Sequence, residues 1–93
     1  MNLGHALKMC RSAKALSLDQ LAERTQLSQS YLSMIESNKR EPTLSTIEKI
    51  SKALDVPVPI VLFLASEKAD LKGLDSETAS RLSIAALNVI RST

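Results

Sequence analysis

Two short amphipathic segments separated by a tight turn constrain this chain more than any other feature. Ser17 and Gln20 form the S-x-x-Q pattern of a capping box, which predicts a helix that follows Ser17 and ends near Thr25. Ser28 comes after a short turn and is a good cap for a second helix. Helices of about two turns are not stable alone in water, so both segments must share a core with their neighbours.

The composition favours helices along the whole chain. Hydrophobic residues make up 44% of the sequence and aromatic residues only 2%, so the core must consist of Leu, Ile, Val and Ala. Two Gly and three Pro leave little room for the turns that an all-β fold needs. Further apolar stripes predict helices over residues 3–14, after Thr43, around Pro59, and from residue 75 or 76 to 91. The stripe after Thr43 comprises Leu44, Ile47, Ile50 and Leu54.

The segment that follows Ser28 has one apolar edge and one uncharged polar face. At about 100° per residue, Leu32 and Ile35 fall on the same side of the helix. The other face carries neutral side chains, which include Gln29, Ser30, Ser33 and Met34. Solvated helices usually carry Lys and Glu there, whereas small hydrogen-bonding groups suit a helix that presses against DNA base edges. Taken alone, the pattern also fits an ordinary surface helix, which is the commoner case.

The charge is distributed unevenly, although the net charge is only +2. Residues 1–54 hold eight Lys and Arg against five Asp and Glu, whereas residues 55–93 hold four against five. A polyanionic partner should therefore meet the first part of the chain. Lys39 and Arg40 come just beyond the neutral helix, where two cations are well placed for a phosphate backbone. A solvated loop is an equally good interpretation of these two residues.

Several classes of function find no support in the sequence. It has no nucleophile–base pair, glycine-rich loop or metal-ligand spacing, so we expect no catalytic residues, no metal site and no cofactor. His5 is expected at the surface, and the single Cys10 in the core fits a reducing cytoplasm. The apolar run 56–65 is too short to span a bilayer, and the N-terminus has no signal core. We expect a cytoplasmic protein with no membrane partner.

The capped helices and their surroundings resemble a known family. Residues 16–57 read LSLDQLAERTQLSQSYLSMIESNKREPTLSTIEKISKALDVP. With their flanks, over residues 3–66, they resemble the Xre, or Cro/C1-type, helix-turn-helix family of lambda-repressor-like DNA-binding domains. The resemblance implies an all-α fold, namely a five-helix DNA-binding domain to which this chain adds a C-terminal helix. It also implies that the helix after Ser28 is the recognition helix, which lies in the DNA major groove.

The resemblance assigns roles to individual residues. Base readers would be Gln29, Ser30, Ser33 and Met34, and residues near phosphates would be Ser17, Ser28, Tyr31, Asn38, Lys39 and Arg40. Arg11 and Glu36 match a pair that often ties the first helix of the family to the third. Leu18 stands where the family often has a Gln that contacts the DNA backbone, so that contact is in doubt here. Met34 could meet a thymine methyl group or leave its position unread.

The C-terminal tail lies outside the resemblance. Lys72 and Gly73 separate the expected fifth helix from the helix that begins at residue 75 or 76. We therefore expect a DNA-binding domain over residues 1–70 and a C-terminal helical element over residues 71–93. Apolar residues cover well over half the circumference of this helix, so one side would be exposed on a monomer. We interpret it as a dimerisation element, the alternative being a helix folded wholly into one domain. The expected interface comprises Phe63, Leu64, Leu82, Ala85, Ala86, Val89 and Ile90.

These features together predict a sequence-specific DNA-binding transcriptional regulator. We interpret it as a repressor that binds a two-fold symmetric operator in double-stranded DNA as a homodimer. The alternative is an antitoxin-type regulator whose tail also binds a second protein. A purely structural helical bundle would explain the apolar core but not the neutral face of the third helix.

Overall fold

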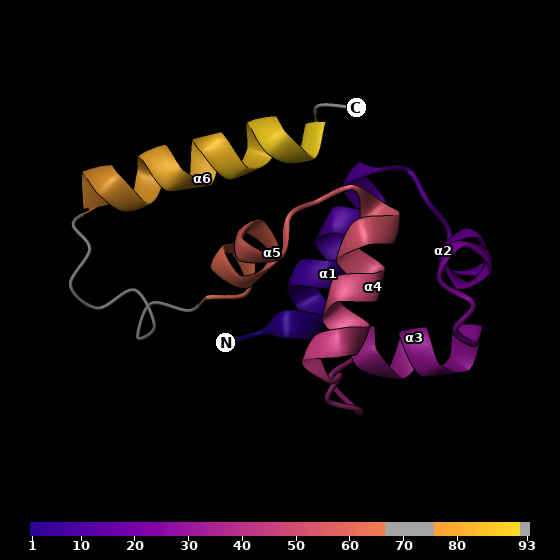
Figure 1. The fold of residues 1–93 in the computed structure, drawn as a ribbon. Helices are drawn as coiled ribbons and strands as arrows, with labels where there is room; N and C mark the ends of the chain where they lie inside the picture. Colours follow the sequence, from indigo (N-terminus) through magenta and orange to yellow (C-terminus); the bar gives the residue numbers. More distant parts are fainter. Residues whose placement is uncertain (67–75, 92–93) are drawn as a thin grey trace.

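Six α-helices and no strands make up the part of the chain that the computed structural model describes, residues 1–66 and 76–91 (Figure 1). They are α1 (Leu3–Ala13), α2 (Leu18–Thr25), α3 (Gln29–Glu36), α4 (Leu44–Leu54), α5 (Val58–Ala65) and α6 (Ser76–Arg91). The all-α prediction, with a sixth helix after the first five, is confirmed. The predicted break at residues 72–73 and the alternative cap at Asp75 lie outside the described residues.

Side-chain caps mark the starts of α1 to α4: Asn2 caps α1 by accepting the N–H of His5 at 3.1 Å, and the other three caps are those predicted from the sequence. The Ser17 hydroxyl accepts the backbone N–H of Gln20 at 3.1 Å, and the Gln20 side chain accepts the N–H of Ser17 at 2.8 Å, completing the capping box. Ser28 caps α3 by accepting the N–H of Tyr31 at 3.1 Å. Thr43 caps α4 in the same way. These caps are confirmed, and each satisfies a backbone donor that the helix itself leaves free.

The turn between α2 and α3 is held by a buried threonine. The Thr25 hydroxyl donates to the carbonyl oxygen of Leu21 at 2.8 Å and accepts the N–H of Leu27 at 3.3 Å. Gln26, the residue after α2, has a φ of 62°, in the left-handed region, and its N–H bonds to the carbonyl of Ala22. The chain therefore reverses within a few residues and presents α3 across α2 (Figure 1).

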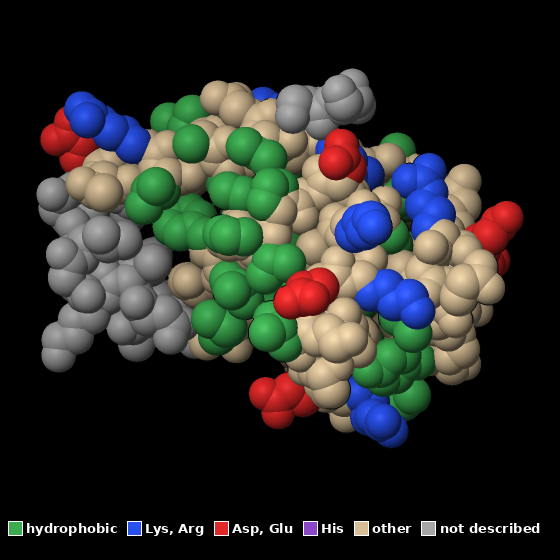
Figure 2. Space-filling view, in the orientation of Figure 1, with side chains coloured by type: hydrophobic (Ala, Val, Ile, Leu, Met, Phe, Trp, Pro, Cys, Tyr) green, Lys and Arg blue, Asp and Glu red, His purple; other side chains and the backbone are tan. Residues whose placement is uncertain are grey.

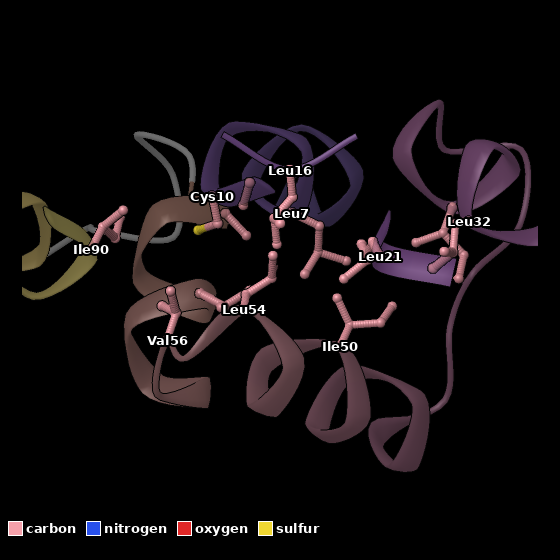
Figure 3. Close-up of a cluster of buried hydrophobic side chains, with 13 residues drawn as sticks. Leu7, Cys10, Leu16, Leu21, Leu32, Ile50, Leu54, Val56 and Ile90 are labelled. Atoms are coloured by element: carbon pink, nitrogen blue, oxygen red, sulfur yellow. The ribbon is translucent and has the colours of Figure 1, made fainter. Parts of the chain in front are cut away.

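One cluster of buried aliphatic side chains holds residues 3–66 together, and we call these residues the body. Every helix of the body contributes to it, and in Figure 3 Leu32 lies at one end and Ile90, from α6, at the other. Each fully buried Leu or Ile contributes about 1.5–3 kcal/mol relative to exposure. The body members are Ala6, Leu7, Cys10, Leu16, Leu21, Leu32, Ile35, Ile50, Leu54, Val56, Val61 and Ala65.

The apolar stripe of α4 is shorter than predicted. Ile47, Ile50 and Leu54 are buried, but Leu44 is exposed. Leu44 belongs to the first turn of α4, at the edge of the stripe, where the helix end extends past the core. Leu44 thus shares the spacing of the stripe without being buried.

The last helix rests on the body through a narrow contact. Figure 1 shows α6 lying beside α5 and away from α2 and α3, and its main contacts are with α1 and α5. Ala86 and Ile90 point into the body and are almost fully buried. Leu82, Ile84 and Leu87 remain 42%, 60% and 40% exposed. The described part of α6 is thus packed along one side only.

Candidate nucleic-acid interface

The outer surface of α3 is a neutral, hydrogen-bonding face. Gln29, Ser30 and Ser33 are exposed and Met34 is half-buried, while the opposite side of the helix packs into the core. The resemblance assigned these four side chains to base reading, and the structure brings them onto one accessible surface. An exposed amide and two exposed hydroxyls can both donate and accept hydrogen bonds, as base edges require.

The single charged residue of α3 is turned away from this surface. Glu36 accepts two hydrogen bonds from Arg11 of α1, at 2.7 Å from Nε and 3.0 Å from Nη2. Their side chains are only 7% and 14% exposed, and Arg11 also donates to the carbonyl of Leu16 at 2.7 Å. The hydrogen bond to Glu36 raises the pKa of Arg11. The expected pair is therefore present, and it neutralises Glu36 while fixing α3 against α1.

The loop after α3 presents two cations from a fixed backbone. Lys39 and Arg40 are exposed, and both of their backbone N–H groups donate to the carbonyl oxygen of Met34, at 2.8 and 3.2 Å. Asn38, just before them, has a φ of 62°, which turns the chain out of the helix. The two side chains therefore extend from the end of α3, beside its neutral face.

Asn38 has a structural task that the sequence did not reveal. Its Oδ1 accepts the backbone N–H of Gly4 at 3.1 Å, and its Nδ2 donates to Oδ1 of Asn2 at 2.8 Å. The amide therefore joins the end of α3 to the start of α1. Nδ2 carries two protons and uses one of them in the bond to Asn2, so the place of Asn38 near a phosphate stays a prediction.

Gly4 allows this close approach of α1 and α3. A Cβ at this position would lie 2.6 Å from Oδ1 of Asn38 and 2.7 Å from the carbonyl oxygen of Glu36, and it would also meet the carbonyl of Ile35. Real Cβ atoms do not come so near to oxygen, so only glycine fits. The signal in the sequence was a glycine inside a predicted helix, where it normally lowers stability.

The remaining predicted phosphate contacts lie around the same surface. Ser17 and Ser28 are exposed, and although their oxygens cap α2 and α3, each hydroxyl keeps a proton to donate. Tyr31 is half-buried, and the guanidinium carbon of Arg40 lies 5.7 Å from the centre of its ring. Leu18 packs against the core, which agrees with the absence of a polar contact at that position.

The residues assigned to a dimer interface divide into two groups. Ala86 and Ile90 are buried against this chain's own body, so in this arrangement they are not free to meet a second copy. Leu82 and Ala85 are exposed, and Phe63, Leu64 and Val89 are half-buried. Ile84 and Leu87, which the sequence assignment did not include, are also well exposed. Figure 2 shows hydrophobic side chains gathered over α6 and the neighbouring part of the body.

Other chemistry has little basis among the described residues. No group of His, Cys, Asp and Glu there could hold a metal ion, and no described helix combines the length and apolar character needed to cross a membrane. His5 is exposed and Cys10 is buried, as expected. Burial raises the pKa of the Cys10 thiol, with Lys14 opposing the shift, so this side chain behaves as a small core residue.

Comparison with known proteins identifies the same region. The helix-turn-helix family HTH_3 matches residues 7–61, which include α2, the turn and α3. The HTH-type transcriptional regulator SinR of Bacillus subtilis (strain 168) is 40% identical over 76 residues, or 81% of this chain and 68% of SinR. The immunity repressor protein of Bacillus phage phi105 is 39% identical over 62 residues, or 67% of this chain and 43% of the repressor. This chain thus matches less than half of the phage protein's length. No solved structure matches the chain significantly.

Proposed function

The chain belongs to the HTH_3 helix-turn-helix family, and from this premise we propose that it is a sequence-specific DNA-binding transcriptional regulator that acts as a repressor. The observation that carries the proposal is the outer face of α3, which is neutral, polar and exposed beside two exposed cations. Similarity to SinR and to a phage immunity repressor supports regulation as the outcome of binding.

The proposed mechanism needs no bond chemistry. In it α3 lies in the major groove, where the Gln29 amide can bond an adenine and the hydroxyls of Ser30 and Ser33 can bond either kind of base. Met34 would contact a thymine methyl group. Lys39 and Arg40 would neutralise phosphates and fix the position of α3, with the hydroxyls of the two helix caps beside them. A bound repressor then blocks access of the polymerase to a promoter.

We further propose a homodimer that binds a two-fold symmetric operator. One recognition helix reads only about three or four base pairs, whereas two helices placed about 34 Å apart read successive turns of DNA. The exposed apolar side chains of α6 offer a surface for the second copy. The proposed contact uses Leu82, Ala85 and Val89 of α6, together with Phe63 and Leu64 of α5.

Selection from a random pool of duplex DNA tests the central proposal. We expect enrichment of one symmetric sequence, with an affinity that falls steeply as salt rises because neutralised phosphates release counterions. If no sequence were enriched at low salt, the proposal would fail.

A pair of substitutions separates base reading from phosphate binding. Gln29→Ala should weaken the free energy of binding to the selected duplex by about 1–3 kcal/mol. It should also relax the preference at one base position in each half-site. Lys39→Ala should weaken binding to the selected and a mixed-sequence duplex by the same factor. Equal losses on both duplexes for Gln29→Ala would remove Gln29 from the base readers.

Sedimentation tests the dimer. We expect a species of twice the 10.1 kDa chain mass at micromolar concentration, and we expect Leu82→Glu to shift it to a folded monomer with weakened operator binding. Ser80→Glu adds the same charge to α6, at an exposed position on the side away from Leu82, Ala85 and Val89, and should leave the dimer intact. A wild-type monomer would refute this interface and would favour a partner of another kind, as in the antitoxin-type alternative.

A further inference from the structure

Arg40 and Lys39 are adjacent cations in the same loop, but the structure holds them differently. The Arg40 guanidinium lies over the face of Tyr31, with 5.7 Å between its central carbon and the ring centre. A cation at this distance is attracted by the negative face of the ring. For Lys39 the described residues show only the backbone bond to Met34. One cation is thus held at its head as well as at its backbone.

The ring itself is well anchored. Tyr31 lies in the first turn of α3, and its backbone N–H donates to the hydroxyl of the Ser28 cap. Its half-buried side chain packs against the hydrophobic core. The Arg40 backbone is fixed from the other side, because its N–H bonds to the carbonyl oxygen of Met34 at 3.2 Å. Both ends of the Arg40 side chain are therefore tied to α3, the helix proposed to enter the major groove.

Holding a long side chain before binding lowers the entropy lost when its contact forms. Arg presents a planar set of donors that matches phosphate in two parallel hydrogen bonds, so its orientation matters more than that of Lys. An Arg fixed to the recognition helix would therefore set the distance between that helix and the DNA backbone.

We propose that Tyr31 is a positioning residue whose ring preorganises the Arg40 guanidinium for a DNA phosphate. Arg40 then makes an oriented contact with the DNA backbone, and Lys39 makes a mobile one. The inference rests on the proposed function, because it concerns the same DNA surface. This role requires only the ring of Tyr31. A direct contact with phosphate would instead require its hydroxyl.

The DNA-free protein provides the first test. Protons of the Arg40 side chain over the ring should have NMR resonances shifted upfield by the ring current in the wild type and in Tyr31→Phe. They should return to ordinary values in Tyr31→Leu. Ordinary values in the wild type would overturn the inference, whatever the stability of the variants. Tyr31 is the single tyrosine of a chain with no Trp, and the comparison with Tyr31→Leu separates its ring current from any due to Phe63 or His5.

A double-mutant cycle on DNA provides the second test, with a mixed-sequence duplex of about two helical turns as the probe. We expect Arg40→Ala to weaken binding about threefold less in the Tyr31→Leu background than in the wild type, and the full effect to persist in Tyr31→Phe. Lys39→Ala, the matched control, should have the same effect in every background.

The outcomes separate this inference from the proposed function. Effects of Tyr31→Leu and Arg40→Ala that simply multiply would overturn the coupling while leaving DNA binding established. A loss of affinity in Tyr31→Phe equal to that in Tyr31→Leu would assign the contact to the hydroxyl and also overturn it. Failure of the wild type to bind any duplex would instead refute the proposed function. Melting curves of each variant confirm that the compared proteins are folded.

Discussion

The body and α6 bury their apolar side chains to very different extents. In the body, the apolar residues of five helices converge on one cluster, and the end of α3 is tied to α1 by an ion pair and by the Asn38 amide. Among the described side chains of α6, only Ala86 and Ile90 are buried against the body, while Leu82, Ile84 and Leu87 remain 42%, 60% and 40% exposed. The body thus buries most of its apolar side chains, whereas α6 adds Ile90 to the same core and leaves several apolar side chains exposed.

The same contrast appears in the polar contacts. The Arg11–Glu36 pair is almost fully buried and joins residues far apart in the sequence, whereas the Arg81–Glu77 pair of α6 joins two side chains that are 77% and 74% exposed. The first pair fixes α3 against α1, whereas the second joins two exposed side chains within one helix. We infer that the body determines the position of the DNA-reading surface and that α6 serves assembly.

Removing Glu36 should have the largest effect. Glu36→Ala leaves the Arg11 guanidinium buried without its carboxylate, and we expect a loss of about 3–5 kcal/mol in the free energy of unfolding. Urea denaturation followed by circular dichroism measures it. A loss below about 1 kcal/mol would mean that the pair behaves like an exposed one and would weaken the contrast with α6.

Gly4→Ala tests the close approach of α1 and α3. Alanine normally favours a helix over glycine by about 1 kcal/mol, but here its Cβ would meet backbone oxygens that cannot move aside. We expect an overpacking cost of about 3 kcal/mol to prevail, with a net loss of about 2 kcal/mol in the free energy of unfolding. Lys8→Ala, on the exposed side of α1, is the control and should change stability little. A more stable Gly4→Ala protein would contradict the contact.

Ile90→Ala measures how firmly α6 belongs to the core. Ile90 is buried as completely as Ile50, yet α6 can shift to fill the space more easily than α4 can. We expect Ile90→Ala to lower the free energy of unfolding by about 2 kcal/mol and Ile50→Ala to lower it further, as measured by chemical denaturation. Equal losses would show that α6 is as integral to the fold as the body helices.

Gln26→Gly should stabilise the turn between α2 and α3. Gln26 has a positive φ that glycine adopts without a steric penalty, so we expect a gain of about 0.5–1 kcal/mol. The substitution also removes the bond from Nε2 of Gln26 to the carbonyl of Glu23, which limits the gain. A loss of stability on thermal melting would show that this bond outweighs the relief of strain.

Glu77→Ala should have the smallest effect. Its partner Arg81 is also exposed, so we expect a change of at most about 0.5 kcal/mol, and less as salt rises. Measured beside Glu36→Ala, this substitution removes the same charge from the same kind of pair. A loss above about 1 kcal/mol would mean that α6 depends on this contact.

The sequence predicted the elements well because their signals are local. The caps at Ser17, Ser28 and Thr43 act on backbone N–H groups three residues away, and the apolar spacing of each helix lies within a few turns. The neutral face of α3 follows from the helix period alone. Even the surplus of apolar residues in α6 could be counted without a structure.

The sequence could not predict contacts that depend on which segments lie side by side in the folded chain. The place of Asn38 beside Gly4 follows from how α1 and α3 pack. The place of Arg40 over Tyr31 follows from the turn that the chain makes after α3, where Asn38 has a positive φ.

Periodicity also could not decide which of the apolar residues around α6 turn toward the body. Ala86 and Ile90 do so, while Leu82 and Ile84 do not, because only the shape of the surface formed by α1 and α5 selects the side that fits. The sequence therefore determined the helices and the face of α3, through interactions within a turn or two of chain. Apart from the Arg11–Glu36 pair, which the family resemblance implied, the tertiary structure alone decided the contacts between distant segments, because those depend on the directions in which whole helices pack.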